Sequence, residues 1–482
     1  MTLNLPNDVL LLVGEFLETH QDRYNLIFVS HRFHDLFLRL VYRAATLQSC
    51  LQTRSFLGAL LRRPELARAV RSLHFKDWNQ QQSSSLAPIS PADVTLFNDW
   101  ARQISHSHEE QTQWEQDLLH EVEEAWIALV LPLVHNLRTL HLVYPKENVY
   151  LDRTLRRAMQ GEKPFHTHPA FRTLHDVSLS HQDHDQDSKG SYCPSQVLPF
   201  FSLPAMRTFS ADSVIEARPS PDEDNQPQQE EEQQHQQQQD PSSSSPITSI
   251  TLTSSNGFQG MQTLIASCPS LQSFKYQHSD THLQSEAYQP SAFHASLSAS
   301  KSSLQTLWLD TCGTHLPFTI SGVNQSHDEW FGSLAEFSAL TDLRIRLPNL
   351  LDVRYQPDPS TALPDVLPES VQSLYVEGCK ETSLAMLVGQ LGKVLEGKMK
   401  KEEKKKQFGS LRRVDIEGFF HEEEDEDASG YEVSSGTGAV AGGGERVIKP
   451  KVYEMVEPLV AACKDAGVEL FLRDRECLAT ML

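Results

Sequence analysis

Apolar residues close to the N-terminus recur with the spacing of an amphipathic helix. At about 100° per residue, steps of one, three, three and one place five side chains along a single helical face: Val9, Leu10, Val13, Phe16 and Leu17. Pro6 suits a first helical turn because it has no amide hydrogen to leave unpaired, and Asp8 places a carboxylate near the positive end of that helix. The pattern predicts a helix that begins near Pro6 and has an apolar face in need of a partner.

A second apolar pattern follows the polar segment THQDRYN, residues 19–25, which we expect to form a turn. Its members are three or four residues apart: Leu26, Val29, Phe33, Leu36 and Leu40. Ser30 interrupts this face and can cap the segment behind it, so we predict two short helices rather than one long helix. Three short helices in about forty residues bury little surface. The segment therefore either docks onto something or begins a larger helical domain.

The order of residues in this segment resembles an F-box. It reads Leu5-Pro6, an acid, paired aliphatics, then Asp22-x-x-x-Leu26-x-x-Val29-Ser30-x-x-Phe33 and an Arg-bearing tail. The resemblance implies a module that docks onto the Skp-type adaptor of a cullin–RING ubiquitin ligase. The adaptor-facing residues that it implies are Leu5, Pro6, Val9, Leu10, Val13, Leu26, Val29, Ser30 and Phe33. Many F-boxes carry Trp where this chain has Phe33, whose smaller ring lacks the indole N–H and buries less area.

After this segment the chain repeats one phrase, in which an apolar residue and two mostly polar residues precede an apolar-x-apolar triplet. The copies are VRSLHF at 70, LRTLHL at 137, FRTLHDVSL at 171, MRTFSA at 206, ITSITL at 247, LQSFKY at 271, LQTLWL at 304, LTDLRI at 340, VQSLYV at 371 and LRRVDI at 411. Helical phrases precede several copies, as in FLGALLRRPELARAVRSLHF and FGSLAEFSALTDLRI. The expected unit is helix, turn, strand. One unit cannot bury its own apolar face, so neighbouring units must stack into a solenoid of parallel strands.

These phrases resemble degenerate leucine-rich repeats of the long type. Most copies lack the Asn or Cys that should follow the LxL, although DTCG at 310–313 and EGCK at 377–380 keep a Cys near that place. The alternative is an ordinary α/β domain whose parallel strands share this rhythm. The predicted fold class is α/β: an N-terminal three-helix F-box over residues 1–47, then an irregular leucine-rich-repeat-like α/β solenoid over residues 48–475 with disordered insertions.

Three segments are too poor in large apolar residues to form a core. They span about 79–91, 217–246 and 421–446, and we expect mobile loops there. Near the C-terminus, VYEMVEPLVAACKDAGVELFLRD predicts a helix through Lys464, a stop at Gly467 and a last strand over residues 468–472 that caps the array.

Composition limits the possible partners and compartments. The chain has 482 residues and a net charge of −22, so phosphate backbones repel it, and we expect no nucleic-acid partner. The basic run at 398–406 contains Glu402 and Glu403 and is typical of a solvated segment. The chain has seven cysteines, an odd number, and none are in C-x-x-C spacing. This pattern suggests reduced thiols. The apolar run after Asp8 has no Lys or Arg before it and no small-residue cleavage site after it, so we do not expect it to be a secretory signal. No stretch has the roughly 20 apolar residues of a membrane span. We expect the cytoplasm or the nucleus, and no membrane contact.

Candidate chemistry is sparse. The 21 histidines include clusters at 106–108 and 166–168, but a metal site needs imidazoles that converge from fixed elements, and these lie in polar loops. No nucleophile elbow, phosphate loop, zinc-protease motif or dinucleotide fingerprint occurs in the sequence. We therefore expect no catalytic residues, no metal and no cofactor.

The two resemblances together imply a substrate receptor of an SCF-type ubiquitin ligase, with the F-box on the adaptor and the repeats on the target protein. Such a receptor performs no bond chemistry and acts by proximity. The alternatives are an F-box scaffold outside a ligase and a cryptic α/β enzyme. We expect the segment from Tyr42 to Arg71 to be mostly helical and to contain no flexible linker. It would then couple the F-box rigidly to the repeats.

Target contacts should lie on the solvent side of the strands, because alternate strand residues point away from the core. The predicted target-binding residues are Trp308, Arg344, Arg346, Tyr375 and Glu377, and the same rule exposes His74, His141, His175, Lys275 and Asp415. Aromatic and Arg side chains are favoured because they carry most interface energy. Arg344 and Arg346 point to an acidic or phosphorylated motif. The alternative for each residue is a solvated position on a strand.

Overall fold

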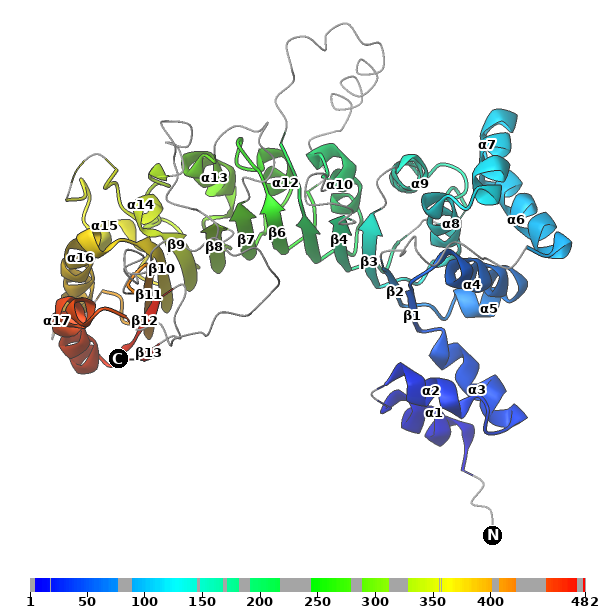
Figure 1. Cartoon of the computed structure of the whole chain (residues 1–482), viewed down its shortest axis with the longest axis horizontal. Coiled ribbons are helices and arrows are strands. Elements are labelled where there is room, and N and C mark those ends of the chain that lie inside the picture. The colour runs from blue at the N-terminus through cyan, green and yellow to red at the C-terminus, as the bar shows by residue number, and fades with distance from the viewer. Residues whose placement is uncertain are drawn as a thin grey trace, which may run out of the picture. The chain divides into compact units, whose positions relative to one another are not determined.

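A computed structural model describes residues 5–17, 19–76, 89–144, 148–167, 171–181, 191–216, 244–278, 288–311, 328–354, 356, 358–400, 407–421, 448–474 and 480–481. The chain divides into two compact units, Met1–Thr253 and Ser254–Leu482. Figure 1 labels the helices and strands of both units. Each unit is described separately below.

The first unit begins with three short helices, α1 (Asn7–Glu15), α2 (His20–Leu26) and α3 (His31–Val41). Pro6 stands at the N-cap of α1, and the Ser30 hydroxyl accepts a hydrogen bond from the Phe33 N–H at 3.2 Å, so both predicted helix starts are confirmed. The predicted turn at THQDRYN is wrong. Thr19 accepts from the Asp22 N–H at 3.0 Å, and this side-chain cap starts α2 inside the polar segment.

The strands of the first unit pair in parallel, each with the next along the chain. They are β1 (Ala44–Leu47), β2 (Ser72–Phe75), β3 (Thr139–Tyr144), β4 (Asp176–His181), β5 (Thr208–Asp212) and β6 (Ser249–Ser255). The connecting helices are α4 (Cys50–Arg62), α5 (Pro64–Ala67), α6 (Pro91–Ile104), α7 (His108–Leu119), α8 (Glu123–Val130), the 3-10 turn Leu131–Leu133, α9 (Val149–Gln160) and α10 (Pro194–Phe201). Residues 44–47, predicted as the end of the F-box, are therefore the first strand of the sheet.

The second unit repeats this arrangement. Its strands are β7 (Ser273–His278), β8 (Thr306–Thr311), β9 (Asp342–Arg346), β10 (Ser373–Cys379), β11 (Arg413–Gly418) and β12 (Glu469–Asp474), all parallel, with β13 (Thr480–Met481) antiparallel to β12. The helices are α12 (Gln262–Ala266), α13 (Pro290–Leu297), α14 (Leu347–Leu350), α15 (Leu363–Val366), α16 (Glu381–Met399) and α17 (Pro450–Ala466), with a 3-10 turn at Ser298–Ser300.

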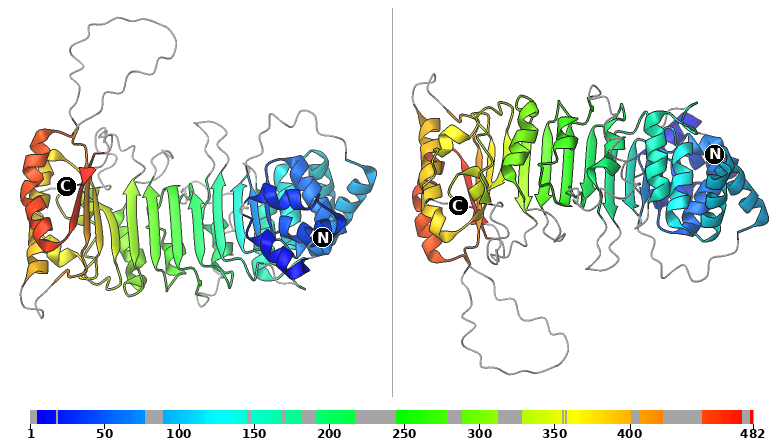
Figure 2. Two further views of the ribbon diagram at one scale, coloured as in Figure 1. Left: turned by 90° about the horizontal axis from the view of Figure 1, so that it is seen from below. Right: turned by 90° about the horizontal axis from the view of Figure 1, so that it is seen from above.

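The apolar positions of the repeated phrase form the cores of both units. Leu140 and Leu374 are fully buried between strands and helices, as are their counterparts in the other copies. Between neighbouring repeats, one backbone carbonyl accepts two N–H groups. The Arg71 carbonyl accepts from Arg138 at 2.7 Å and from Thr139 at 3.0 Å, and the Gln372 carbonyl accepts from the next repeat in the same way. Helices α9 and α10 cover one face of the first unit's strands, and α12 and α13 cover one face in the second, so each sheet keeps an open strand face (Figures 1 and 2).

Two copies of the phrase differ from the prediction. In FRTLHDVSL the buried residue that begins the repeat is Leu174, and the strand starts at Asp176. His175 therefore precedes the strand, and Ser178 takes the place on the strand face that was predicted for His175. The second difference is FGSLAEFSAL, which forms turns instead of a helix. Gly332 has a φ of 125°, which is far from helical geometry and open mainly to glycine.

The predicted insertions lie mostly outside the described residues. The described ends of these segments are partly structured. Ser90 caps α6 and Pro91 is the first residue of that helix, so the segment predicted as 79–91 ends where a helix begins. Ser245 is buried, and His421 forms an antiparallel bridge with Ile448. In the basic run 398–406, Lys398 and Met399 belong to α16, and residues 401–406 lie outside the described part. The C-terminal prediction is confirmed: α17 ends at Gly467, whose φ is 63°, and β12 follows.

Candidate interaction surfaces

The three N-terminal helices share a small core. Leu10, Phe37 and Leu40 are buried in it, and Leu26, Ile27, Phe33 and Leu36 pack against it. Gly14 allows this close packing, because a Cβ there would lie 2.6 Å from a Phe37 ring carbon and 2.8 Å from a Leu40 methyl carbon. The side of α1 that carries Leu10 and Gly14 therefore faces α3.

The other side of α1 and the end of α2 carry apolar side chains that are exposed among the described residues. Of the thirteen large apolar residues that are exposed in the described residues, eight lie before residue 30, and we call them the outer apolar surface. They are Leu5, Val9, Leu12, Val13, Phe16, Tyr24, Phe28 and Val29. Phe16 is 79% exposed, and the rings of Tyr24 and Phe28 meet edge to face at 5.0 Å. Apolar patches of this kind mark interaction sites.

The nine residues predicted to face an adaptor fall into three groups. The exposed ones are Leu5, Pro6, Val9, Val13, Val29 and Ser30. Leu26 and Phe33 are half-buried, with the Phe33 and Phe37 rings 5.2 Å apart, and Leu10 is buried in the helical core. Sequence reasoning missed Leu12, Phe16, Tyr24 and Phe28 as surface residues. Helical spacing predicts that α1 has an apolar face. The absence of a side chain at Gly14 is the feature that indicates which side of α1 packs against α3.

Ordered structure joins the three helices to the repeats. Tyr42 stacks on Phe56 of α4 with ring centroids 5.6 Å apart, and the Arg43 carbonyl accepts N–H groups from Arg71 and Ser72. Strand β1 starts directly afterwards and pairs with β2. The expectation that no flexible linker separates residues 42 and 71 is confirmed, although the segment contains a strand as well as helices.

On the open strand face of the second unit, one row of side chains runs in register across six strands. It contains Lys275, Trp308, Arg344, Tyr375, Asp415 and Phe471. Cations lie over the aromatic rings: the Lys275 ammonium is 3.8 Å from the Trp308 centroid, and the Arg344 guanidinium is 4.5 Å from that of Tyr375. Such cation–π pairs hold long side chains in fixed positions.

Two carboxylates on this face, Glu377 and Asp415, are buried. Asp415 is 1% exposed and accepts hydrogen bonds at 2.6 Å from both Arg413 Nε and Arg473 Nε. Glu377 is 1% exposed and lies 3.4 Å from Arg344. The prediction that these two carboxylates are exposed is wrong, because neighbouring Arg side chains cover them and β10 carries a register shift after Val376.

The remaining predicted target residues are half-buried and already bonded within the unit. Trp308 donates from its indole N–H to Asp342 at 3.0 Å, and Arg346 lies 3.1 Å from Asp328. Tyr375 donates its hydroxyl hydrogen to Glu417; burial and this hydrogen bond raise the pKa of the tyrosine above its usual value. Sequence reasoning missed Arg413, Phe471 and Arg473, although β11 and β12 continue the same row.

The corresponding row in the first unit has a different chemistry. Its residues are His74, His141, Ser178, Ser210 and Thr251. The rings of His74 and His141 lie 5.3 Å apart. Burial, together with the nearby His141 and Lys76, lowers the pKa of His74. This face offers small hydroxyl groups and imidazoles rather than aromatic rings and guanidinium groups.

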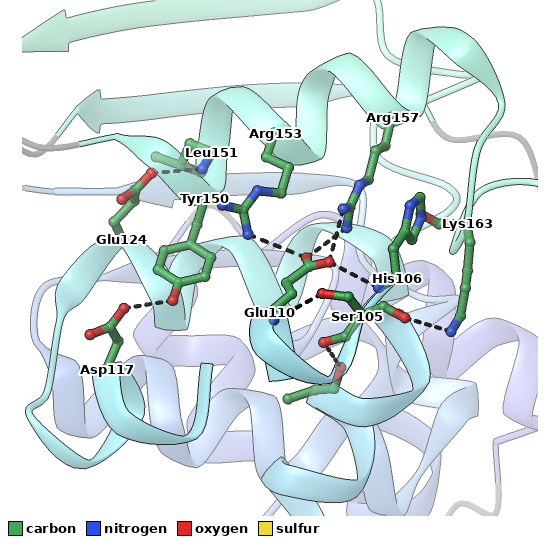
Figure 3. A network of polar contacts seen from close by, with 12 residues as sticks. Ser105, His106, Glu110, Asp117, Glu124, Tyr150, Leu151, Arg153, Arg157 and Lys163 are labelled. Atoms are coloured by element: carbon green, nitrogen blue, oxygen red, sulfur yellow. Dashed lines mark hydrogen bonds and ion pairs between the residues drawn. The ribbon is translucent and has the colours of Figure 1, made fainter. Parts of the chain in front are cut away.

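Two buried carboxyl groups of the first unit, those of Glu110 and Glu124, lie among its helices (Figure 3). Glu110 of α7 accepts hydrogen bonds from both terminal nitrogens of Arg157 at 2.8 and 3.0 Å, and from the His106 N–H at 2.9 Å. Burial opposes ionisation of Glu110, but these bonds outweigh it and lower its pKa to about 2. Glu124 of α8 accepts from the Leu151 N–H at 2.7 Å, yet burial raises its pKa to about 8. These contacts fasten α7 and α8 to α9.

Neither unit contains a recognisable chemical centre within the described residues. No three His, Cys, Asp or Glu side chains gather there as a metal site would require. His106, from one predicted cluster, lies 2.9 Å from the Lys163 carbonyl, while His168 of the other cluster falls outside the described part. Among the described helices, none combines the length and apolar character that a membrane crossing needs.

Comparison with known proteins identifies the repeats. A family model described as a leucine-rich repeat domain matches residues 44–411, which starts at β1 and reaches the beginning of β11. A search of curated proteins finds no match. The match covers more than half of the chain and agrees with the stacked parallel strands of both units. The chain therefore belongs to the leucine-rich repeat family.

Proposed function

We propose that this chain is the substrate receptor of an SCF-type ubiquitin ligase, with α1–α3 docking onto a Skp-type adaptor and the repeats binding the target. A leucine-rich repeat domain suggests protein–protein interaction. Adaptor docking in particular is supported by the outer apolar surface, because it lies on helices whose residue order resembles an F-box. The site residues for adaptor binding are then its eight members together with Pro6 and Ser30.

Energetics support docking as the role of this surface. Complete burial of one large aliphatic or aromatic side chain is worth about 1.5–3 kcal/mol. Exposed in water, the outer apolar surface gains nothing, while a partner that covers it gains several such contributions. The core beneath it contains only three fully buried side chains, so a partner would also stabilise the module.

The mechanism that follows is one of proximity. A ubiquitin-conjugating enzyme held elsewhere in such a ligase performs the transfer to a target lysine, and the receptor raises the local concentration of the target. The ordered connection from α3 through Tyr42 and β1 suits this role, because it joins the docking helices directly to the first repeats. This role places the protein in the cytoplasm or the nucleus.

The test is binding of the purified full chain to a Skp-type adaptor, measured by calorimetry. Val9→Asp with Val13→Asp places two charges on the outer apolar surface without touching the helical core. We expect the adaptor affinity to fall on the order of 100-fold, since two central contacts are lost. The matched control is Leu119→Asp with Val149→Asp, which charges two exposed apolar residues on α7 and α9.

Three outcomes separate the candidate functions. If the unmodified chain binds no Skp-type adaptor, or if both double variants behave alike, the proposal is wrong. Adaptor binding without recovery of a cullin would favour the scaffold function over the ligase. Leu10→Asp is a poor probe because Leu10 belongs to the core, and its loss would unfold the module.

A further inference from the structure

The open strand face of β9–β12 has charges arranged in two layers. The carboxylates of Glu377 and Asp415 are buried, whereas the side chains of Arg413 and Arg473 above Asp415 are 40% and 26% exposed. We propose that this face binds an acidic segment of the target protein through Arg413 and Arg473, with Tyr375 and Phe471 supplying apolar contacts. The inference rests on the proposed function in that the repeats hold the target.

Hydrogen-bonding capacity remains on both guanidinium groups. Within the described residues, Arg473 bonds to Asp415 through Nε alone, and Arg413 bonds to it through Nε and Nη2. Both terminal nitrogens of Arg473 and the second terminal nitrogen of Arg413 can therefore donate to a partner. Asp415 is shared by two cations, so these three groups together carry one net positive charge, and the Glu417 carboxylate lies opposite Arg473 in the strand register. A guanidinium group binds carboxylates and phosphates through paired N–H donors.

The aromatic rings fix the cations and add apolar area. Arg413 and Arg473 lie 4.4 and 5.4 Å from the Phe471 centroid, and Arg473 also lies 5.8 Å from that of Tyr375. Because the ring contacts and the buried Asp415 hold the guanidinium groups in place, little side-chain entropy is lost on binding. A fitting segment combines acidic residues with apolar or aromatic ones.

Strand spacing sets the length of that segment. Arg344 on β9 and Arg473 on β12 are three strands apart, about 14 Å at the usual separation of roughly 4.8 Å. An extended peptide spans that distance with about four residues. Two acidic residues four positions apart would thus place one at the Arg413 and Arg473 pair and the other near Arg344, which itself lies 3.4 Å from Glu377. This face also carries Asp328 beside Arg346, Asp342 bonded to Trp308, and Glu417 and Glu469 on β11 and β12, and these carboxylates disfavour acidic residues outside that spacing.

The experiment measures fluorescence anisotropy of labelled twelve-residue peptides with the full chain. One peptide carries two Glu residues four positions apart among Leu and Tyr, a second has Gln in their place, and a third has phosphoserine. The test variant combines Arg413→Gln, Asp415→Asn and Arg473→Gln, which removes the buried carboxylate with its cations and leaves none of the three groups charged. Arg102→Gln is the control, because it changes the net charge by the same single unit at an exposed site on α6.

We expect the Glu peptide to bind about tenfold or more tightly than the Gln peptide, a preference lost in the triple variant and kept in the control. Tighter binding of the phosphoserine peptide would also support the site and would identify phosphate as the preferred anion. Equal binding of the Glu and Gln peptides overturns the inference, as does an unchanged preference in the triple variant. Competition by single-stranded DNA at the same residues overturns the assignment to a protein segment.

Adaptor binding is measured on the same samples, so that the two proposals fail separately. A triple variant that binds the adaptor but not the Glu peptide supports both. A chain that shows the peptide preference and no adaptor binding overturns the ligase function alone. If the triple variant fails to fold, Arg473→Gln replaces it, because Arg413 still neutralises Asp415 in that variant, and the same loss of preference is expected.

Discussion

The two units share a backbone pattern but differ in where two buried carboxyl groups of each lie: among the helices in the first unit, on the strand face in the second. In the first unit Glu110 and Glu124 lie among helices α7 to α9, and the strand face carries small hydroxyl groups and His74 and His141. In the second unit the buried carboxylates lie on the strand face beneath Arg and aromatic side chains. The repeat fold does not constrain the residue between the two apolar positions of each strand. In the second unit these residues form a row of paired cations, aromatic rings and a carboxylate.

This difference separates maintenance of the fold from recognition. A carboxylate that joins helices holds the array together, whereas one beneath a strand face orients the cations that a partner would meet. The second arrangement is costly, since a buried charge is tolerated only when it is paired and hydrogen-bonded. Its presence on the open face of one unit and not of the other favours that face as the place of target binding. The following substitutions test the contrast.

The largest effect is expected from Asp415→Ala in the second unit. The substitution leaves the Arg413 and Arg473 guanidinium groups close together without their shared carboxylate, so unfolding of this unit should become easier by about 3–5 kcal/mol. Ser210→Ala at the corresponding position of the first unit should cost less than about 1 kcal/mol. Urea denaturation followed by circular dichroism measures both. Similar losses for the two variants would mean that the strand faces do not differ as described.

Glu110→Gln should produce the next largest effect, in the first unit. The amide keeps a hydrogen-bond acceptor but loses the charge that pairs with Arg157 and Arg153, which we expect to cost about 2–3 kcal/mol at pH 7. The pKa of Glu110 is lowered to about 2, below the roughly 4.5 of the unfolded chain, so its contribution is present above pH 4.5 and is lost as pH falls toward 2. The difference between wild type and variant should shrink across that range.

Glu124→Gln should show the opposite pH dependence. Because burial raises the pKa of Glu124 to about 8, the folded state keeps a proton that the unfolded state releases above about pH 4.5. The wild type therefore loses stability as pH rises from about 4.5 to 8, and the amide removes this loss. At pH 9 the variant should be more stable by at least about 1.4 kcal/mol, the equivalent of one pKa unit. At pH 4.5 the two proteins should be nearly equal. Denaturation at both pH values decides between this and a purely steric role.

The sequence predicted the positions of helices and strands better than it predicted which side chains are exposed to solvent. The Ser30 cap and the Gly467 stop follow from interactions within a few residues, and the buried LxL positions follow from period-two alternation. The second helix was predicted too late in the chain, because the start of α2 depends on Thr19 and Asp22, a cap pattern inside a polar segment. Such features are readable from sequence when each polar segment is checked for capping pairs.

The prediction of solvent exposure was wrong where exposure depends on neighbouring side chains. Alternation places Glu377 and Asp415 on the solvent side. Glu377 is covered by Arg344 of the adjacent strand β9, and Asp415 by Arg473 of the adjacent strand β12 and by Arg413, two residues away on β11. Similarly, the spacing on α1 gave one apolar face, whereas the structure divides it between Leu10 in the core and Phe16 at the surface. These outcomes depend on which residues the sheet register and helix packing bring together.

The smallest expected effect tests whether the strand face of the second unit is preorganised. Lys275→Gln removes the ammonium that lies 3.8 Å from the Trp308 ring centroid, and a half-exposed cation–π pair is worth about 0.5–1 kcal/mol. His141→Gln, at an equivalent place in the first unit, removes a ring contact of 5.3 Å without a cation and should cost less. Tryptophan fluorescence distinguishes the two, because only the first change frees the Trp308 indole. An unchanged emission spectrum with Lys275→Gln would mean that the aromatic rings of this face are held by the Asp342 hydrogen bond and packing alone.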